Sequence, residues 1–426
     1  VFLAGIPSAI LLLIPVNHEK LLKSIFRNIL VVTSCCICIG IIAGFYYQDY
    51  ASLLRNNRHL RDQIIPLNFI YAGFSYGKDQ LKNKTRNLQP VGRDAQAKTD
   101  WRNIPSGKKV ISIIVIGETA RAQSFSLGGY NRKTNPELEK QDIIYFDNFS
   151  SCGTTTSVSV PCMFSPFPEK RFSTSDAANH ENLLDVLMHA GLDVLWRDNN
   201  SGCKGVCERV EYDDVSHLQE IELCNDDECY DEILLNKLND KIESYPVNNG
   251  LVIVLHMHGS HGPDYFLRAP KAFRQFTPFC HTNQLQDCTR QEILNAYDNT
   301  ILYSDHVLNQ IIDFLKQHQS SYSSSLLFLS DHGESLGESN LYLHGLPRSI
   351  APQEQTRIPA FLWLSESFSD DFHINNHCLE QIAHKPFSHD NLFHSVLGML
   401  DLSTKVYQAD LDLFRACKIE TKADLS

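Results

Sequence analysis

The chain has 426 residues, enough for one large domain or two smaller ones. Its formal net charge is -12, and no basic block is long enough to resemble a nucleic-acid footprint. These features argue against DNA or RNA as a partner. An anionic substrate must therefore be met by local positive charge rather than by the charge of the whole protein.

Two uncharged apolar runs lie near the beginning of the chain. At about 1.5 Å per residue, the run Ile29–Tyr47 nearly spans the roughly 30 Å hydrocarbon core of a bilayer, so it predicts a transmembrane helix. Val1–Val16 predicts the end of an earlier transmembrane helix. A signal peptide is the alternative for this first run, although it lacks a basic segment and a clear small-residue cleavage site.

The orientation of the predicted membrane region follows from its basic residues. Lys20, Lys23 and Arg27 lie between the two apolar runs, in what we expect to be a short loop. The positive-inside rule places this loop in the cytoplasm and the chain after Tyr47 on the other side of the membrane.

Cysteine usage agrees with an external location. Most cysteines follow the apolar runs and form pairs that are close in sequence, which indicates local disulfides in an oxidising compartment. A zinc ribbon is the alternative for Cys203–Cys207 with Cys224–Cys229, but the residues between them are acidic and lie outside the cytoplasm. Only parity pairs the remaining Cys378 with Cys417.

Residues 48–107 are polar and mixed, and they predict a juxtamembrane amphipathic connector that ends in a linker, Asn83–Gly107. Arg55, Arg58 and Arg61 lie near the membrane exit, where they can contact anionic head groups. A solvated helix face is the alternative for these arginines.

From Lys109 onward, apolar runs alternate with helical patterns. Val110–Ile116 is continuous and β-branched, which is typical of a buried parallel strand. Further strands are predicted at Ile143–Phe146, Val194–Trp196, Leu251–Leu255, Leu326–Leu329 and Ile358–Leu364. Helices are predicted at Glu181–Ala190, Asp231–Glu243, Arg290–Gln317 and Asp390–Leu400. The serine-rich run Ser320–Ser325 is predicted to be a loop. The alternation predicts an α/β/α sandwich around a mostly parallel sheet, within a domain that spans residues 108–426.

The stretch Ser151–Ser165 gathers hydroxyl side chains between Cys152 and Cys162. A hydroxyl on a sharp turn, held by a disulfide and followed by a helix, is a candidate covalent nucleophile. The N–H groups and the dipole of the helix N-terminus favour an anionic group at this position. The alternative is a Ser/Thr-rich capped turn without a chemical role.

Carboxylate and imidazole side chains come directly after three predicted strands, where ligands collect in open α/β sheets. They are Glu118, then His256, His258 and His261, then Asp331 and His332, with His344 a little further on. Each has an alternative explanation: a helix N-terminal acid for Glu118, a turn for Asp331 and His332, and a core histidine for His256. Because they occur at three strand ends, they jointly favour a zinc-type metal site.

Six segments carry a family resemblance: Val115–Arg121, Ser151–Ser165, Trp196–Cys207, Gly259–Pro263, Ser330–Glu338 and Tyr342–Gly345. Together they resemble the lipid A phosphoethanolamine transferases, including the mobile colistin-resistance group, within the alkaline phosphatase/sulfatase-like superfamily. The resemblance extends over the whole chain, because the apolar runs resemble the last two of the family's five helices. We therefore expect the sequence to be a fragment that lacks the first three.

The resemblance implies a metal centre and a nucleophile. It makes Thr156 the nucleophile, and it makes Glu118, Thr156, Asp331 and His332 the ligands of one catalytic zinc, with a second zinc ion as a further option. Coordination by zinc lowers the pKa of a hydroxyl and makes the alkoxide accessible.

The resemblance also implies substrate-binding positions. His261 and His344 match positions near the substrate phosphate or a second zinc, and they are candidates for a general acid or base. Asn200 and Lys204 match positions that bind the phosphoethanolamine group. His258 stands where an apolar residue is expected, and no role is assigned to it.

The family's disulfides correspond to Cys152–Cys162, Cys203–Cys207, Cys224–Cys229 and Cys280–Cys288. The resemblance places the protein in the bacterial inner membrane, with residues 1–47 as a partial transmembrane region and residues 108–426 as a periplasmic catalytic domain. We expect a monomer.

The implied activity is transfer of phosphoethanolamine from phosphatidylethanolamine to a lipid A phosphate through a covalent Thr156 intermediate. Transfer lowers the negative surface charge and gives polymyxin resistance. The alternatives are a metal-dependent phosphodiesterase and transfer to a lipopolysaccharide core sugar. A sulfatase would need a Cys/Ser-x-Pro-x-Arg motif, and Thr156 is not in one. A binding protein without activity would need lost metal ligands, and none of the matched positions is lost.

Overall fold

The computed structural model describes residues 21–47, 68–69, 72–73, 76, 88–101, 103–218, 220, 222–224, 228–246 and 249–419. The chain divides into two compact units, Val1–Tyr50 and Ala51–Ser426, and each is described by itself. The predictions for Val1–Val16, for Lys20 and for Arg55, Arg58 and Arg61 lie outside the described residues.

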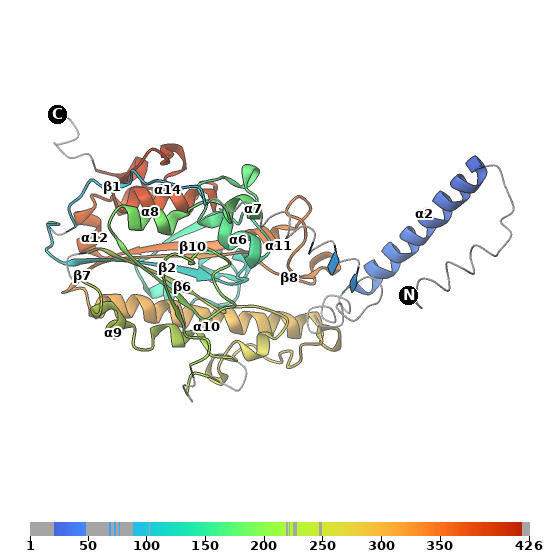
Figure 1. The fold of residues 1–426 in the computed structure, drawn as a ribbon. Helices are drawn as coiled ribbons and strands as arrows, with labels where there is room; N and C mark the ends of the chain where they lie inside the picture. The colour runs from blue at the N-terminus through green and yellow to red at the C-terminus, as the bar shows by residue number, and fades with distance from the viewer. Residues whose placement is uncertain are drawn as a thin grey trace. The chain divides into compact units, whose positions relative to one another are not determined.

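The first unit contains the helix α2 (Leu21–Phe45), drawn in blue in Figure 1. Its segment Lys23–Ile42 is the one helix among the described residues that is long and apolar enough to cross a membrane. The helix begins before the predicted span, so Lys23 and Arg27 are helical rather than in a loop. No glycine or proline lies between Leu21 and Ile39, and long basic side chains can extend from a helix end toward a polar interface.

The second unit is built around an eight-stranded sheet with the strand order β11-β3-β10-β7-β2-β6-β4-β5. The strands are β2 (Lys109–Gly117), β3 (Ile144–Ser150), β4 (Asp193–Asp198), β5 (Glu211–Asp214), β6 (Leu251–His256), β7 (Tyr322–Ser330), β10 (Arg357–Leu364) and β11 (Phe387–Ser388). Strand β10 runs antiparallel to both of its neighbours, and every other pair is parallel. The predicted mostly parallel sheet is therefore confirmed.

Helices cover both faces of this sheet, as predicted for an α/β/α sandwich (Figure 1). One side carries α8 (Leu183–His189), α12 (Glu366–Asp371) and α14 (Asp390–Met399), whose side chains Leu184, Phe368 and Leu397 belong to the main hydrophobic core. The other side carries α9 (Leu238–Glu243) and the long α10 (Arg290–Gln317). Because both faces are covered, the apolar side chains of β2 are buried on both sides, which explains the continuous β-branched run.

The N-terminus of α10 agrees with the prediction because a capping box fixes it. The Thr289 side chain accepts from the backbone of Glu292, and the Glu292 side chain accepts from the backbone of Thr289. The predicted helix Asp231–Glu243 is instead broken into a 3-10 turn, Asp231–Leu235, and α9. Lys237 between them has a left-handed φ of 52°, which ends the first helix.

Two predictions about loops are wrong. The serine-rich run enters β7, because Ser325 bonds the hydroxyl of Ser112 in the paired strand (2.7 Å) and Ser323 donates to Asp371 (2.6 Å). Part of the predicted linker packs against the rest of the second unit, and its side chains Val91 and Ile104 belong to the hydrophobic core. In the same segment, β1 (Gln96–Ala97) pairs with β12 (Leu402–Ser403).

Five disulfides lie in the second unit. They are Cys152–Cys162, Cys203–Cys207, Cys224–Cys229, Cys280–Cys288 and Cys378–Cys417. Four of them join cysteines within ten residues of each other, and the fifth spans a separation of 39. Cys35, Cys36 and Cys38 in α2 are free thiols.

Candidate active site

Glu118 and Asp331 leave the sheet at one edge. Strands β2 and β7 are parallel neighbours with Gly117 opposite Ser330, so the residue that follows each strand emerges at the same carboxyl end. Glu118, Asp331 and His332 are all fully buried, and one ligand atom from each lies within 4.8 Å of the others. We call these three residues the metal-ligand cluster.

The loop after β2 is held by a side chain of α10. Thr119 has a left-handed φ of 61°, which turns the chain directly after Glu118. The Tyr297 hydroxyl of α10 donates to the Thr119 carbonyl (2.7 Å) and accepts from the Arg121 N–H (2.9 Å). Gly259 must be glycine here, since a Cβ would lie 2.7 Å from the Glu118 carbonyl oxygen.

The donor atoms of the cluster fit a divalent cation. Asp331 Oδ1 accepts from the N–H groups of Thr119 (3.0 Å) and His332 (2.7 Å), while its buried Oδ2 accepts no hydrogen bond from the described residues. His332 Nδ1 donates to the Gly333 carbonyl (2.9 Å), which leaves the Nε2 lone pair free to face a metal. A buried carboxylate oxygen without a donor is costly, and a bound cation would satisfy it.

The charges of the cluster are strongly coupled. Burial and the nearby Glu118 raise the pKa of Asp331 to about 6. Burial alone would lower the pKa of His332, but Asp331 and Glu118 raise it to about 9. Burial would raise the pKa of Glu118, yet its hydrogen bond with His332 and the surrounding imidazoles lower it well below the ordinary value. The cluster therefore favours a positive charge at its centre, either a proton on His332 or a metal ion.

Thr156 meets this cluster at the first residue of α6 (Thr156–Met163). Its Oγ1 donates to Glu118 Oε2 (2.8 Å) and lies 3.5 Å from His332 Nε2. The disulfide Cys152–Cys162 ties the preceding loop to the same helix. Gly153 allows the tight turn, because a Cβ there would lie 2.7 Å from the Ser159 hydroxyl. A hydroxyl is thus held against the carboxylate of the metal-ligand cluster.

Asn200 joins the cluster from the loop that follows β4. Its Nδ2 donates to Glu118 Oε2 (2.9 Å) and to the Met257 carbonyl (2.8 Å). The buried Asp198 holds it there: Oδ1 accepts from the Asn200 N–H (2.8 Å), and Oδ2 bonds His256 Nδ1 (3.0 Å). The sequence analysis missed Asp198, although its position at a strand end is the signal that identified the other residues.

His344 and His261 lie beside the cluster but outside the group of three potential ligands. The ring centroid of His344 is 4.3 Å from that of His332 and 5.7 Å from that of His261. His344 Nδ1 bonds the buried Glu334 (2.7 Å), which the sequence analysis also missed. His258 lies further out, where its Nδ1 is 3.8 Å from Glu228 Oε2.

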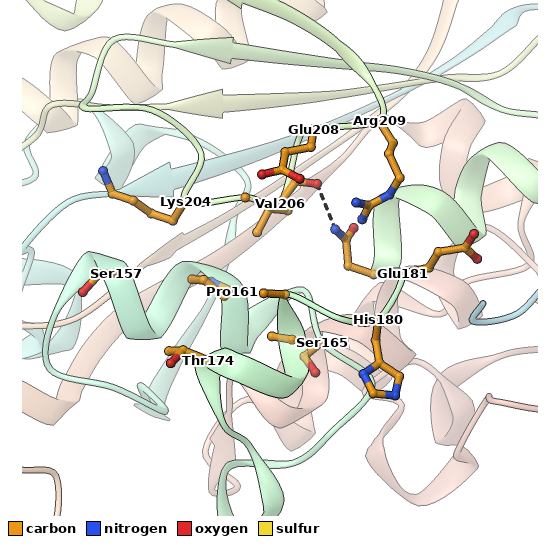
Figure 2. A pocket seen from close by; sticks show the side chains of 14 residues that line it. Ser157, Pro161, Ser165, Thr174, His180, Glu181, Lys204, Val206, Glu208 and Arg209 are labelled. Atoms are coloured by element: carbon orange, nitrogen blue, oxygen red, sulfur yellow. Dashed lines mark hydrogen bonds between the residues drawn. The ribbon is translucent and has the colours of Figure 1, made fainter. Parts of the chain in front are cut away.

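Lys204 is not in contact with the metal-ligand cluster. Its Nζ donates to the carbonyl and the hydroxyl of Ser201 (2.6 and 2.7 Å). It lines a cavity of about 110 Å³ beside α6. Figure 2 shows Ser157 and Pro161 of α6 on one wall of this cavity and Lys204 with Glu208 on the other.

The fold and this geometry define the class of protein. A mostly parallel sheet that presents buried metal-type ligands at one end, beside a hydroxyl at the start of a helix, is a sulfatase-like enzyme domain, and the Sulfatase family model matches residues 111–402. The family model described as phosphoethanolamine transferase EptA/EptB matches residues 1–81.

Comparison with individual proteins identifies the family within this superfamily. The phosphoethanolamine transferase EptA of Escherichia coli K12 is 43% identical over 402 residues, covering 94% of this chain and 72% of that protein. The phosphatidylethanolamine transferase Mcr-1 of Escherichia coli is 37% identical over 375 residues, covering 85% and 68%. The integral membrane lipooligosaccharide phosphoethanolamine transferase A of Neisseria meningitidis superimposes with a TM-score of 0.77 at 38% identity, covering 98% and 77%. The chain belongs to the EptA family of phosphoethanolamine transferases.

Proposed function

We propose that this protein transfers phosphoethanolamine from phosphatidylethanolamine to a lipid A phosphate, with Thr156 as the covalent nucleophile. The observation that carries the proposal is the 2.8 Å contact between Thr156 Oγ1 and Glu118 in the metal-ligand cluster. The product carries an added ammonium group, which lowers the negative charge of the outer surface and weakens the attraction of cationic polymyxins.

Zinc is the metal that we infer for this site. Glu118, Asp331 and His332 supply two carboxylates and one imidazole, which zinc accepts in catalytic sites, and Thr156 Oγ1 completes the set. The periplasmic domain of EptC from Escherichia coli, 23% identical, is described as a complex with Zn. When bound, the ion would lower the pKa of the Thr156 hydroxyl.

Residues of the chain itself carry out nucleophilic attack, proton transfer and orientation. Thr156 Oγ1 gives its proton to a neighbouring imidazole and attacks the phosphorus of the donor, the bond to the diacylglycerol oxygen breaks, and that oxygen takes a proton. His344 and His261 are the imidazoles beside the cluster, and we propose that one of them supplies this proton. A lipid A phosphate oxygen then gives up its proton and attacks the same phosphorus, the bond to Thr156 Oγ1 breaks, and Thr156 Oγ1 takes that proton. Asn200, held by Asp198, orients Glu118 throughout.

We propose that the cavity beside α6 binds the head group of the donor lipid. Its volume of about 110 Å³ suits a small polar group, and Lys204 lies on its wall. We propose that Lys204 leaves Ser201 to bind the donor phosphate, because its ammonium bonds only neutral groups of its own loop in this structure.

The protein is an integral membrane protein with a periplasmic catalytic domain. The apolar helix α2 fits a membrane span. Its relatives include the integral membrane transferase of Neisseria meningitidis and a C-terminal periplasmic domain of EptC from Campylobacter jejuni. Both substrates stay in the bilayer, which gives a membrane anchor a physical purpose.

Mass spectrometry of lipid A from cells that express the protein or its Thr156→Ala variant tests the proposal. We expect a phosphoethanolamine increment with the native protein only. An increment on the sugar Kdo instead would assign a different acceptor, as in the Kdo(2)-lipid A phosphoethanolamine 7''-transferase of Salmonella typhimurium, which is 28% identical. Release of diacylglycerol without any modified lipid A would replace the transferase by a phosphodiesterase.

A further inference from the structure

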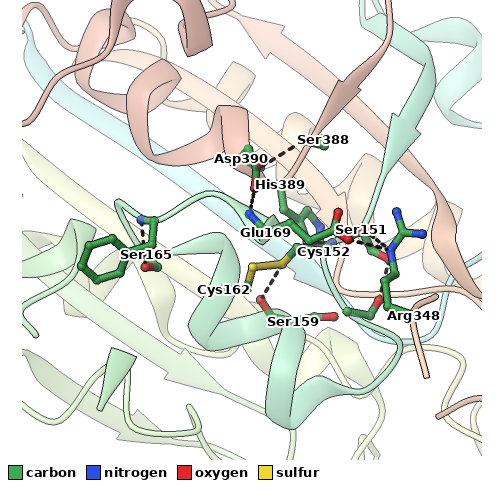
Figure 3. Close-up of a disulfide and its surroundings, with 12 residues drawn as sticks. Ser151, Cys152, Ser159, Cys162, Ser165, Glu169, Arg348, Ser388, His389 and Asp390 are labelled. Carbon is green, nitrogen blue, oxygen red and sulfur yellow. Dashed lines mark hydrogen bonds and ion pairs between the residues drawn. A yellow bond between two sulfur atoms is a disulfide. The ribbon is translucent and has the colours of Figure 1, made fainter. Parts of the chain in front are cut away.

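The buried imidazole of His389 contacts both the loop before Thr156 and the end of β7, the strand before Asp331. His389 is 1% exposed and directly precedes α14. Its Nδ1 is 3.2 Å from the Cys152 N–H, and its Nε2 is 3.0 Å from the Ser330 carbonyl oxygen. Figure 3 shows the ring beside the disulfide that Cys152 forms with Cys162 of α6.

The two hydrogen bonds define the protonation of the ring. A carbonyl oxygen only accepts, so Nε2 carries the proton and donates to Ser330, while Nδ1 accepts from the Cys152 N–H. Burial lowers the pKa of His389 to about 4, which keeps the ring neutral at neutral pH. The main chain adds a third tie, since the His389 N–H donates to the Ser150 carbonyl (3.0 Å).

The partners of His389 belong to different parts of the catalytic machinery. Cys152 lies in the loop that leads to Thr156, and its disulfide fixes it to the nucleophile helix. Ser330 is the last residue of β7, directly before Asp331, and its hydroxyl accepts from the Ala120 N–H (2.9 Å) in the loop after Glu118. One ring therefore contacts the nucleophile loop and the strand that presents the metal ligands.

We propose that His389 is a positioning residue that sets the place of Thr156 relative to Asp331 and His332. The proposal rests on the proposed function and adds to it a residue that contacts neither substrate nor metal. Its two bonds reach residues 237 and 59 positions away in sequence, so the ring joins two segments that are distant along the chain. Residues that orient metal ligands typically affect metal affinity or activity about 10- to 100-fold.

The helix α14 offers a matched control. His394 is also 1% exposed, and burial lowers its pKa to about 4 as well. Its Nδ1 accepts from the Gln408 N–H (3.1 Å), and its ring contacts Phe393 and Tyr407. His394→Ala therefore removes a buried neutral imidazole from the same helix without removing a contact to the nucleophile loop or to β7.

The test compares His389→Ala with His394→Ala for kcat, KM, melting temperature and zinc affinity measured by chelator competition. We expect both variants to lose thermal stability, but only His389→Ala to lose about tenfold or more in kcat and in zinc affinity, with KM nearly unchanged. Equal effects of the two variants on kcat and zinc affinity would reduce His389 to a packing residue, and unchanged values in His389→Ala would reject the proposal.

Two conservative variants separate the bonds. His389→Asn keeps an acceptor near the place of Nδ1, and His389→Gln keeps a donor near the place of Nε2, so each should recover part of the loss in His389→Ala. No recovery by either would count against positioning through these bonds. Zinc affinity does not depend on turnover, and Thr156→Ala measured in parallel reports on the proposed transfer itself. A native protein that binds zinc but transfers nothing would overturn the proposed function and leave the effect on zinc affinity to decide the role of His389.

Discussion

Thr156 Oγ1 donates to Glu118 Oε2 across 2.8 Å, although the two residues are 38 positions apart and come from different elements. Glu118 ends a buried parallel strand, and Thr156 begins a helix whose preceding loop is held by a disulfide. The same carboxylate also accepts from Asn200 (2.9 Å). One carboxylate thus connects the hydroxyl, the metal-ligand cluster and the loop that follows β4.

Replacement of the hydroxyl tests its covalent role. We expect Thr156→Ala to lower kcat by about 10³-fold or more, because removing a catalytic nucleophile leaves only binding and electrostatic contributions. Thr156→Ser should retain part of the activity since it keeps the hydroxyl. Lipid A mass spectrometry measures the outcome, and circular dichroism checks the fold. Full activity of the alanine variant would contradict covalent catalysis.

Removal of the metal tests the cluster independently. We expect chelation to abolish transfer and to lower the melting temperature, because a ligand that binds only the native state stabilises it. Zinc should restore both, whereas magnesium should not, since it prefers an all-oxygen octahedral site. A melting temperature that does not respond to chelator or to zinc would argue against a metal bound by these residues.

Substitution of Asp198 tests whether its hydrogen bond to the Asn200 N–H positions Asn200. Asp198→Asn places an amide opposite the N–H groups of Asn200 and Trp196, so one donor loses its acceptor. We expect a loss of about 1–3 kcal/mol in the free energy of unfolding and a reduced kcat/KM. Asp213→Asn in the neighbouring strand is the control, because Asp213 is 31% exposed and its carboxylate pairs with Arg197 at a longer distance of 3.5 Å. Urea unfolding and transfer kinetics should separate the two variants.

The disulfide Cys152–Cys162, which lies next to Thr156, is expected to contribute to both stability and geometry. Its cysteines are ten residues apart, and closing a loop of that size stabilises a fold by about 2–4 kcal/mol in the chain-entropy view. We expect the Cys152→Ala, Cys162→Ala double variant to lose stability and most activity. The Cys280→Ala, Cys288→Ala double variant, which opens a loop of eight, should lose similar stability but little activity. Equal activity losses would place the effect in global stability alone.

Acid should destabilise the domain partly through His394. Burial lowers the pKa of His394 to about 4, so between pH 6.5 and 4 the unfolded chain binds a proton that the folded chain excludes. The free energy of unfolding therefore falls as the pH falls through this window, by about 2 kcal/mol for this group between pH 7 and pH 5. His394→Gln should show a smaller difference between urea unfolding at these two pH values. An unchanged difference would mean that His394 accepts a proton without cost.

Local patterns predicted much of the fold and the site. Apart from Ser112, the run Val110–Ile116 is apolar on the side chains that face both layers, which suits a buried strand, and β2 extends it by one residue at each end. The ends of such strands can be predicted from the sequence. Because the carboxyl ends of parallel strands meet, Glu118, Asp331 and His332 were predicted to lie together. The short run Ser320–Ser325 was predicted to be a loop, but the groups that bond the hydroxyls of Ser323 and Ser325 in β7, Asp371 and Ser112, come from distant segments.

The sequence by itself determined the class of each element, the membrane helix and the strand ends where the potential metal ligands lie, because each depends on side chains near one another in the chain. Tertiary structure alone decided how those residues are held. Asp198 supports Asn200, and His389 lies between Cys152 and Ser330, through hydrogen bonds whose partners meet only after the sheet has formed. A buried polar side chain must find its partner wherever the fold places one, and no local pattern records that position.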